Sequence, residues 1–136
     1  YFALIPSEHL EPGSGAATQD ADWFPITDDG GVAETLAFDH NQLVGDAVER
    51  LRAKVGYTLL PVYLLPEQFT FSELQAIYEI VLGRRLYKAS LRKRILETEA
   101  IEEVPGAMRT AANRPAQLYR LKPGVQMHYF SNTLAG

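Results

Sequence analysis

The chain has 136 residues, 46% of them hydrophobic and 22% charged, and a formal net charge of −4 at pH 7. This composition argues against a mostly disordered chain, and the lack of cysteine excludes disulfide bonds and thiolate-bound zinc. No apolar run approaches the roughly 20 residues that span a bilayer, so we expect a cytoplasmic protein with no membrane segment.

The charges are unevenly placed. The first 49 residues carry ten acids and no base, whereas residues 84–136 carry ten bases and four acids. This asymmetry favours a polyanionic partner for the second half of the chain, and nucleic acid is the polyanion that such a basic segment most often meets.

The N-terminal region predicts little regular structure. Residues 1–5 read as a strand that Pro6 ends, and a loop rich in Gly and Pro follows over residues 7–22. The start has no basic segment and only a short apolar run, so we expect no signal peptide. Because the initiator methionine is missing, we expect a fragment or a processed product.

A first helix is predicted after Asp39, a suitable N-cap, and Gly56 closes it. Its apolar face recurs at helical spacing: Leu43, Val44, Ala47, Val48, Leu51 and Val55. Residues 57–65 are apolar but interrupted by Pro61, and their pattern leaves an extended segment and a short helical turn both open.

A second helix begins with a capping-box sequence, in which the Thr70 side chain can accept from the Glu73 amide while Glu73 reaches back. Phe69 and Leu74 occupy the two positions of a hydrophobic staple. The expected buried face is Leu74, Ile77, Tyr78, Val81 and Leu82, and Gly83 is the expected C-terminal stop.

A third helix is predicted from about Lys88 to Glu97, with Leu91 and Ile95 on one face. Two helices joined by a short turn containing glycine indicate a helix-turn-helix. Two strands follow over residues 100–104 and 116–121, joined by a loop that contains Pro105, Gly106 and two arginines. A hairpin with a basic loop is typical of the wing of a winged helix. The tail from Val125 shows no strong periodicity.

The third helix is therefore the candidate recognition helix. Seven residues are predicted to contact DNA: Lys88, Ser90, Arg92, Lys93 and Arg94 on the helix, and Arg109 and Arg114 in the wing. The alternative is an ordinary helix with a solvated basic face. Arg120, inside the last strand, is expected to pair with a nearby glutamate.

Enzymatic signals are weak. The three histidines are scattered and show no metal-ligand spacing, and no glycine-rich phosphate loop or nucleophile elbow is present. Residues 99–106 partly match the carboxylate-rich box with which Nudix enzymes hold Mg²⁺. However, Thr98 replaces the arginine of that box and its glycine is one place late, so we reject a metal site there.

Several ordered segments together resemble the C-terminal part of the Nudix-related transcriptional regulators of NAD metabolism. The resemblance covers about residues 23–122. The matching segments are Trp23-Phe24-Pro25, Leu36-Ala37-Phe38-Asp39-His40, Arg50-Leu51-Arg52-Ala53-Lys54 with Tyr57, Phe69-Thr70-Phe71-Ser72-Glu73-Leu74-Gln75 through Gly83, and Arg114-Pro115-Ala116-Gln117-Leu118-Tyr119-Arg120. One departure is that the family favours Asn-Phe where this chain has Ser90-Leu91. Loss of that asparagine, a natural reader of adenine, makes a different operator sequence expected.

The resemblance implies an α+β chain in which residues 1–54 are the C-terminal remnant of a Nudix domain, its strands plus its last helix. Residues 55–123 would be a winged helix-turn-helix DNA-binding domain, and residues 124–136 a tail. It implies a homodimer on a double-stranded DNA operator, acting as a repressor of genes of NAD or related nucleotide or sugar metabolism. An ADP-ribose-like effector would bind the intact Nudix domain.

The Nudix box would lie before Tyr1, so no catalytic residue and no cofactor are expected in this chain, while Mg²⁺ remains possible in the intact protein. One alternative is a Nudix hydrolase of the ADP-ribose pyrophosphatase type with an appended winged helix. Another is a winged helix that binds protein.

Overall fold

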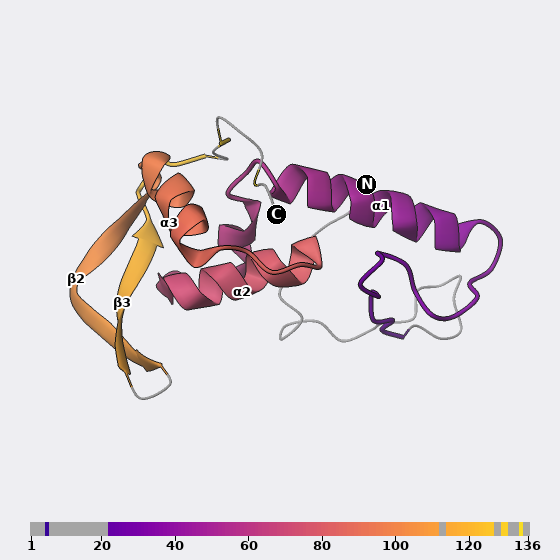
Figure 1. Cartoon of the computed structure of the whole chain (residues 1–136), viewed down its shortest axis with the longest axis horizontal. Helices are drawn as coiled ribbons and strands as arrows, with labels where there is room; N and C mark the ends of the chain where they lie inside the picture. Colours follow the sequence, from indigo (N-terminus) through magenta and orange to yellow (C-terminus); the bar gives the residue numbers. More distant parts are fainter. Residues whose placement is uncertain (1–4, 6–21, 112–113, 127–128, 131–133, 135–136) are drawn as a thin grey trace. The chain divides into compact units, whose positions relative to one another are not determined.

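The computed structural model describes residues 5, 22–111, 114–126, 129–130 and 134 (Figure 1). The chain divides into two compact units, Tyr1–Arg50 and Leu51–Gly136, and helix α1 (His40–Val55) runs across their boundary. The strand expected over residues 1–5 lies outside the described residues except for Ile5. The unit Leu51–Gly136 includes residues 124–136, for which a separate tail was predicted.

In the first unit the described residues form a turn and the start of α1. The Thr27 amide donates to the Gly31 carbonyl at 2.9 Å, and Gly30 has a positive φ of 93°. Helix α1 begins directly after Asp39, as predicted, and the Asp39 carbonyl accepts from the Leu43 amide at 3.0 Å. Several large apolar side chains here are exposed: Trp23, Phe24, Ile26, Phe38 and Leu43 keep 45–96% of their surface.

The second unit contains five further elements and a short helical turn. After the end of α1 come the 3₁₀ helix η2 (Leu60–Leu64), strand β1 (Phe69–Thr70), helices α2 (Phe71–Leu82) and α3 (Lys88–Glu97), and strands β2 (Ile101–Ala111) and β3 (Arg114–Leu121). The three strands form an antiparallel sheet in the order β1-β3-β2. A helix pair followed by a hairpin is the arrangement of a winged helix, and Figure 1 shows α3 beside this hairpin.

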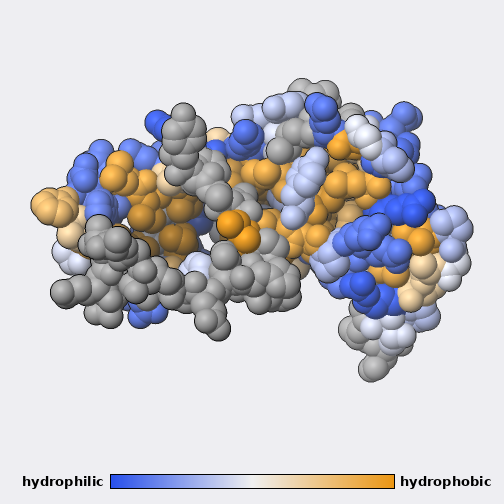
Figure 2. All heavy atoms as spheres, turned by 180° about the vertical axis from the view of Figure 1, so that it is seen from behind, coloured by the Kyte–Doolittle hydropathy of each residue, from blue (hydrophilic) through white to orange (hydrophobic). Residues whose placement is uncertain are grey.

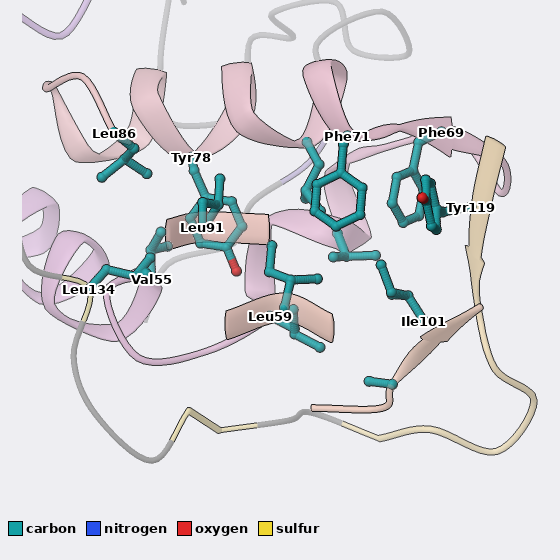
Figure 3. Close-up of a cluster of buried hydrophobic side chains, with 14 of the residues drawn as sticks. Val55, Leu59, Phe69, Phe71, Tyr78, Leu86, Leu91, Ile101, Tyr119 and Leu134 are labelled. Carbon is teal, nitrogen blue, oxygen red and sulfur yellow. The ribbon is translucent and has the colours of Figure 1, made fainter. Parts of the chain in front are cut away.

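The core of this unit is one cluster of buried apolar side chains drawn from every element (Figure 3). Leu74 and Tyr78 of α2 and Ile95 of α3 are fully buried, and Phe69 and Tyr119 bring the sheet against them. Full burial of a side chain of this size contributes about 1.5–3 kcal/mol relative to exposure. The cluster therefore fixes α2, α3 and the sheet as one body.

Helix α2 has the ends that its sequence predicts. The Glu73 amide donates to Thr70 Oγ1 at 3.2 Å, and the Thr70 amide donates to Glu73 Oε2 at 2.7 Å, which completes the capping box. At the other end Gly83 adopts a φ of 67°. The amides of Gly83 and Arg84 donate to the carbonyls of Ile80 and Glu79, which is the bonding pattern of a Schellman motif.

The short turn after α2 is held by the Glu79 carboxylate. Glu79 accepts from Gln75 Nε2 at 3.0 Å and from the Leu86 amide at 2.8 Å, and it pairs with Arg85 at 3.2 Å. Two of these hydrogen bonds lower the pKa of Glu79. The bond from the Gln75 side chain has the larger effect, and the bond from the Leu86 amide adds to it. These bonds fix the path from α2 to α3.

Three features differ from the sequence prediction or go beyond it. The open segment 57–65 contains a 3₁₀ helix, with Pro61 in its first turn. Strand β1 was not predicted; it pairs Phe69 with Tyr119 and Thr70 with Leu118. The end of the chain returns to the core: Leu134 is 4% exposed, and its amide donates to the Gly56 carbonyl at 2.7 Å.

The hairpin loop was predicted to begin near Pro105, but β2 continues to Ala111. A register shift between Glu103 and Met108 marks a bulge, in which Gly106 has a φ of 69°. A bulge tolerates proline because its residues leave the hydrogen-bonded ladder. Gln117 Nε2 donates to the Val104 carbonyl at 2.9 Å and so supports the bulge from β3.

The Glu73 carboxylate should make stability depend on pH. Partial burial raises its pKa, but hydrogen bonds from the Thr70 amide and Arg109 outweigh this effect, so the pKa of Glu73 lies below its ordinary value of 4.5. Its stabilisation is therefore present above about pH 4.5 and is lost as the pH falls through the lower pKa of the folded chain. Urea unfolding from pH 3 to 7 should show a difference between wild type and Glu73→Gln that shrinks on acidification.

Thr70→Ala is the comparison for that measurement. It removes the cap's bond to the Glu73 amide, which does not titrate, so most of its cost of about 0.5–2 kcal/mol should persist at every pH. A Glu73→Gln difference that stayed constant down to pH 3 would contradict a charge-dependent contribution.

Candidate nucleic-acid interface

Helix α3 presents a basic, open side opposite its buried side. Leu91 and Ile95 are 2% and 0% exposed and face the core. With 3.6 residues per turn, Ala89 and Lys93 lie on the opposite side of the helix, and both are exposed. Small Ala89 leaves room for the close approach of a ligand surface, and Lys93 supplies charge.

The structure places the seven predicted contact residues on α3 and the hairpin. Five are exposed and two are half-buried; the exposed ones are Lys88, Ser90, Arg92, Lys93 and Arg114, and the half-buried ones are Arg94 and Arg109. Figure 2 shows, on the right of the view, hydrophilic residues beside hydrophobic ones over the part of the chain that carries the hairpin. The predicted helix bounds and buried positions of α3 are confirmed.

The Arg92 side chain, although exposed, contacts other residues of the domain. Its guanidinium carbon lies 4.7 Å from the centre of the Phe71 ring and 5.6 Å from that of Tyr119, and Arg92 Nη2 donates to the Tyr119 hydroxyl at 2.7 Å. That hydroxyl donates in turn to Glu103 Oε1 at 3.2 Å. Burial raises the pKa of Tyr119 although the charge of Arg92 opposes this, so the hydroxyl keeps the proton that it donates.

Arg109 is also engaged, because it lies in β2 rather than in a loop. It pairs with Ala116 across the hairpin, and its Nη1 donates to Glu73 Oε1 at 2.6 Å. Its Nη2 donates to the Gln68 carbonyl at 3.1 Å. These bonds tie the hairpin to the start of α2, so Arg109 is less available to a phosphate than its predicted place in the loop implied.

Three other cations, Lys88, Lys93 and Arg114, are more open. Lys93 Nζ lies 3.8 Å from Glu97 Oε1, and both side chains are largely exposed, so this pair is worth at most about 1 kcal/mol. Within the described parts of the chain, no acid forms an ion pair with Lys88 or Arg114. Lys88, Lys93 and Arg114 are thus the predicted contact residues whose charge is least committed.

Known proteins have a similar arrangement. Residues 61–121 match the family model of the NrtR DNA-binding winged helix domain. This segment has the winged helix arrangement described above and is similar to that domain.

Known relatives extend the likeness beyond residues 61–121. The chain is 41% identical over 120 residues to the ADPR responsive transcriptional repressor NtrR of Acinetobacter baylyi, which covers 88% of this chain and 46% of that protein. Two crystal structures of Shewanella oneidensis NrtR are similar. One is a complex with a 27mer DNA (TM-score 0.68, 37% identity) and the other is NrtR (TM-score 0.67, 39% identity). Each likeness covers 88% of this chain and 53% of the solved one. The chain therefore spans about half the length of these relatives.

Two exposed residues of this winged helix were missed by the sequence prediction. The Arg85 side chain is 94% exposed in the turn between α2 and α3, and Tyr87, directly before α3, is 81% exposed. Both lie between the Gly83 stop and the first turn of α3, and this place in the sequence could have indicated that they are exposed. Arg120, in contrast, pairs with Glu102 at 2.8 Å, as predicted.

The stretch 99–106, considered and rejected as a metal site, contains the end of the turn after α3 and most of the bulged part of β2. The described residues of the chain contain no group of three or more histidines or acids placed to hold a metal ion. In the same residues, no helix is both long and apolar enough to cross a membrane.

Proposed function

We propose that this chain is the DNA-binding part of a transcriptional repressor, and that the exposed side of α3 enters the major groove of a double-stranded operator. The observation that carries the proposal is the open basic side of α3: Lys88 and Lys93 are exposed around the small residues Ala89 and Ser90. Arg114, at the start of β3, pairs with Ala111 of β2 next to the loop of the hairpin. Such a surface suits base contacts from the helix and a phosphate contact from the hairpin.

Two relatives support the same function. One is a transcriptional repressor that responds to ADPR, and another was crystallised with a 27mer DNA. We infer that the intact protein is a homodimer that responds to an ADP-ribose-like ligand and controls genes of NAD or related nucleotide or sugar metabolism. Two recognition helices would then lie about one DNA turn apart on the operator.

We further propose that residues 1–54 belong to a Nudix domain that senses this ligand, and that Mg²⁺ would bind there in the intact protein. The exposure of Trp23, Phe24 and Leu43 supports this view, since exposed side chains of this size suit part of a domain whose core other residues complete.

An experiment on the intact protein tests the sensing role. Titrating ADP-ribose into its complex with a duplex from upstream of its own operon should change fluorescence anisotropy. An unchanged signal at saturating ligand would contradict it.

This chain by itself is expected to lack pyrophosphatase activity, because the carboxylate stretch 99–106 lies mainly on a β-strand instead of a helix. Incubation with ADP-ribose and Mg²⁺, followed by assay of phosphate-containing products, should give no turnover above a protein-free control. Steady turnover that co-purifies with the chain would favour the alternative of a Nudix hydrolase.

A further inference from the structure

One small cluster joins four elements around the candidate recognition helix. Phe71 is the first residue of α2, Arg92 lies on α3, Glu103 on β2 and Tyr119 on β3. The Phe71 and Tyr119 rings meet edge to face with centroids 4.8 Å apart, and the Arg92 guanidinium lies over both rings. Arg92 thus links α3 to the hairpin through the Tyr119 hydroxyl.

This geometry depends on the shape of a guanidinium. A planar, delocalised cation can lie over an aromatic ring while one of its N–H groups is directed at a hydroxyl, whereas a lysine ammonium is a compact charge without that plane. Arg92 would give up its contacts with Tyr119 and Phe71 in order to swing toward a phosphate. Lys93, the next residue, has no comparable commitment, because its nearest acid is the exposed Glu97 at 3.8 Å.

We propose that Arg92 is a positioning residue, which fixes the recognition helix relative to the hairpin through its planar guanidinium instead of contacting phosphate. Arg109 ties the same hairpin to the start of α2, which is packed with α3 in the core, through Glu73 and the Gln68 carbonyl. The two arginines set the spacing between α3 and Arg114, and hence where their contacts meet one DNA molecule. This inference rests on the proposed DNA-binding function for its consequence, but the positioning itself can be measured without DNA.

The DNA-free measurement uses the absence of cysteine from the chain. Ala89→Cys on α3 and Thr110→Cys on β2 place two spin labels on exposed positions of the two elements. Double electron–electron resonance should give a narrow distance distribution in this background. Arg92→Lys should broaden or shift it, because the charge stays but the stacked plane is lost, whereas Lys93→Gln should leave it unchanged. An unchanged distribution in Arg92→Lys would overturn the proposal.

The second measurement follows binding to a fluorescein-labelled duplex from upstream of the protein's own operon at several salt concentrations. Arg92→Lys and Arg92→Gln should both weaken binding by about fivefold to tenfold without changing the slope of log affinity against log salt. Lys93→Gln should lower that slope by about 0.9 per protomer. If Arg92→Lys binds like wild type while Arg92→Gln loses slope, Arg92 is a phosphate contact and the proposal is wrong. If the duplex is not bound at all, the proposed function fails, and the spin-label result still decides the positioning role.

Discussion

Replacing Tyr78 with alanine is expected to lower the free energy of unfolding of the unit Leu51–Gly136 by about 3–5 kcal/mol. Tyr78 is fully buried, and its hydroxyl donates to the Thr58 carbonyl at 2.6 Å. Burial raises the pKa of Tyr78, so the hydroxyl keeps its proton and this bond through alkaline pH. Because a small domain has only about 5–15 kcal/mol of total stability, this one change should remove a large part of it.

Two further variants separate the contribution of the Tyr78 hydroxyl from that of its ring and supply a control on the same helix. Tyr78→Phe keeps the ring and leaves the Thr58 carbonyl without its phenolic donor, and it should cost about 1–3 kcal/mol. Ile80→Ala on the same helix changes a side chain that is 72% exposed, and it should stay within about 0.5 kcal/mol of wild type. Urea unfolding followed by circular dichroism measures all three. A Tyr78→Ala variant as stable as Ile80→Ala would show that this helix is not the centre of the core.

The helices of the second unit could be predicted because their signals are local. The capping box of Thr70 and Glu73, the Gly83 stop and the spacing of Leu91 and Ile95 each depend on residues a few positions apart. The same holds for the start of α1 after Asp39. Local rules of this kind need no knowledge of the rest of the fold.

The features that the sequence did not reveal all depend on residues distant in the chain. Strand β1 exists because Phe69 pairs with Tyr119, and Leu134 is buried because the chain returns to Gly56. The bulge that carries β2 past Pro105 is supported by Gln117 on the other strand. Pairing between residues 13 to 78 positions apart leaves no periodic pattern that an analysis of single segments could detect.

The same distinction applies to the candidate interface. Charge and spacing were enough to propose α3 and its exposed cations from the sequence. They could not show that Arg92 faces Tyr119 on β3, or that Arg109 faces Glu73 on α2, because these partners lie 27 and 36 positions away. Of the predicted contact residues, Lys88, Lys93 and Arg114 therefore become the strongest candidates for phosphate contacts.

Removing those three charges is expected to have the largest effect on DNA binding. The triple variant Lys88→Ala, Lys93→Ala, Arg114→Ala should lower the slope of log affinity against log salt by about 0.9 for each contact in each protomer. When the salt rises from 50 to 200 mM, the affinity of wild type should therefore fall by a factor about forty times larger, per protomer, than the affinity of the variant. At low salt the variant should bind much more weakly, because the attraction of the phosphates is lost.

The salt dependence of binding tests DNA recognition by α3 and the hairpin most directly. Fluorescence anisotropy with a duplex from upstream of the protein's own operon should give a steep slope for wild type and a shallow one for the triple variant. Arg120→Ala is the matched control on β3, because Arg120 is paired with Glu102 inside the hairpin, and it should leave the slope unchanged. If the triple variant keeps the wild-type slope and affinity at every salt concentration, the exposed basic side of α3 does not bind DNA.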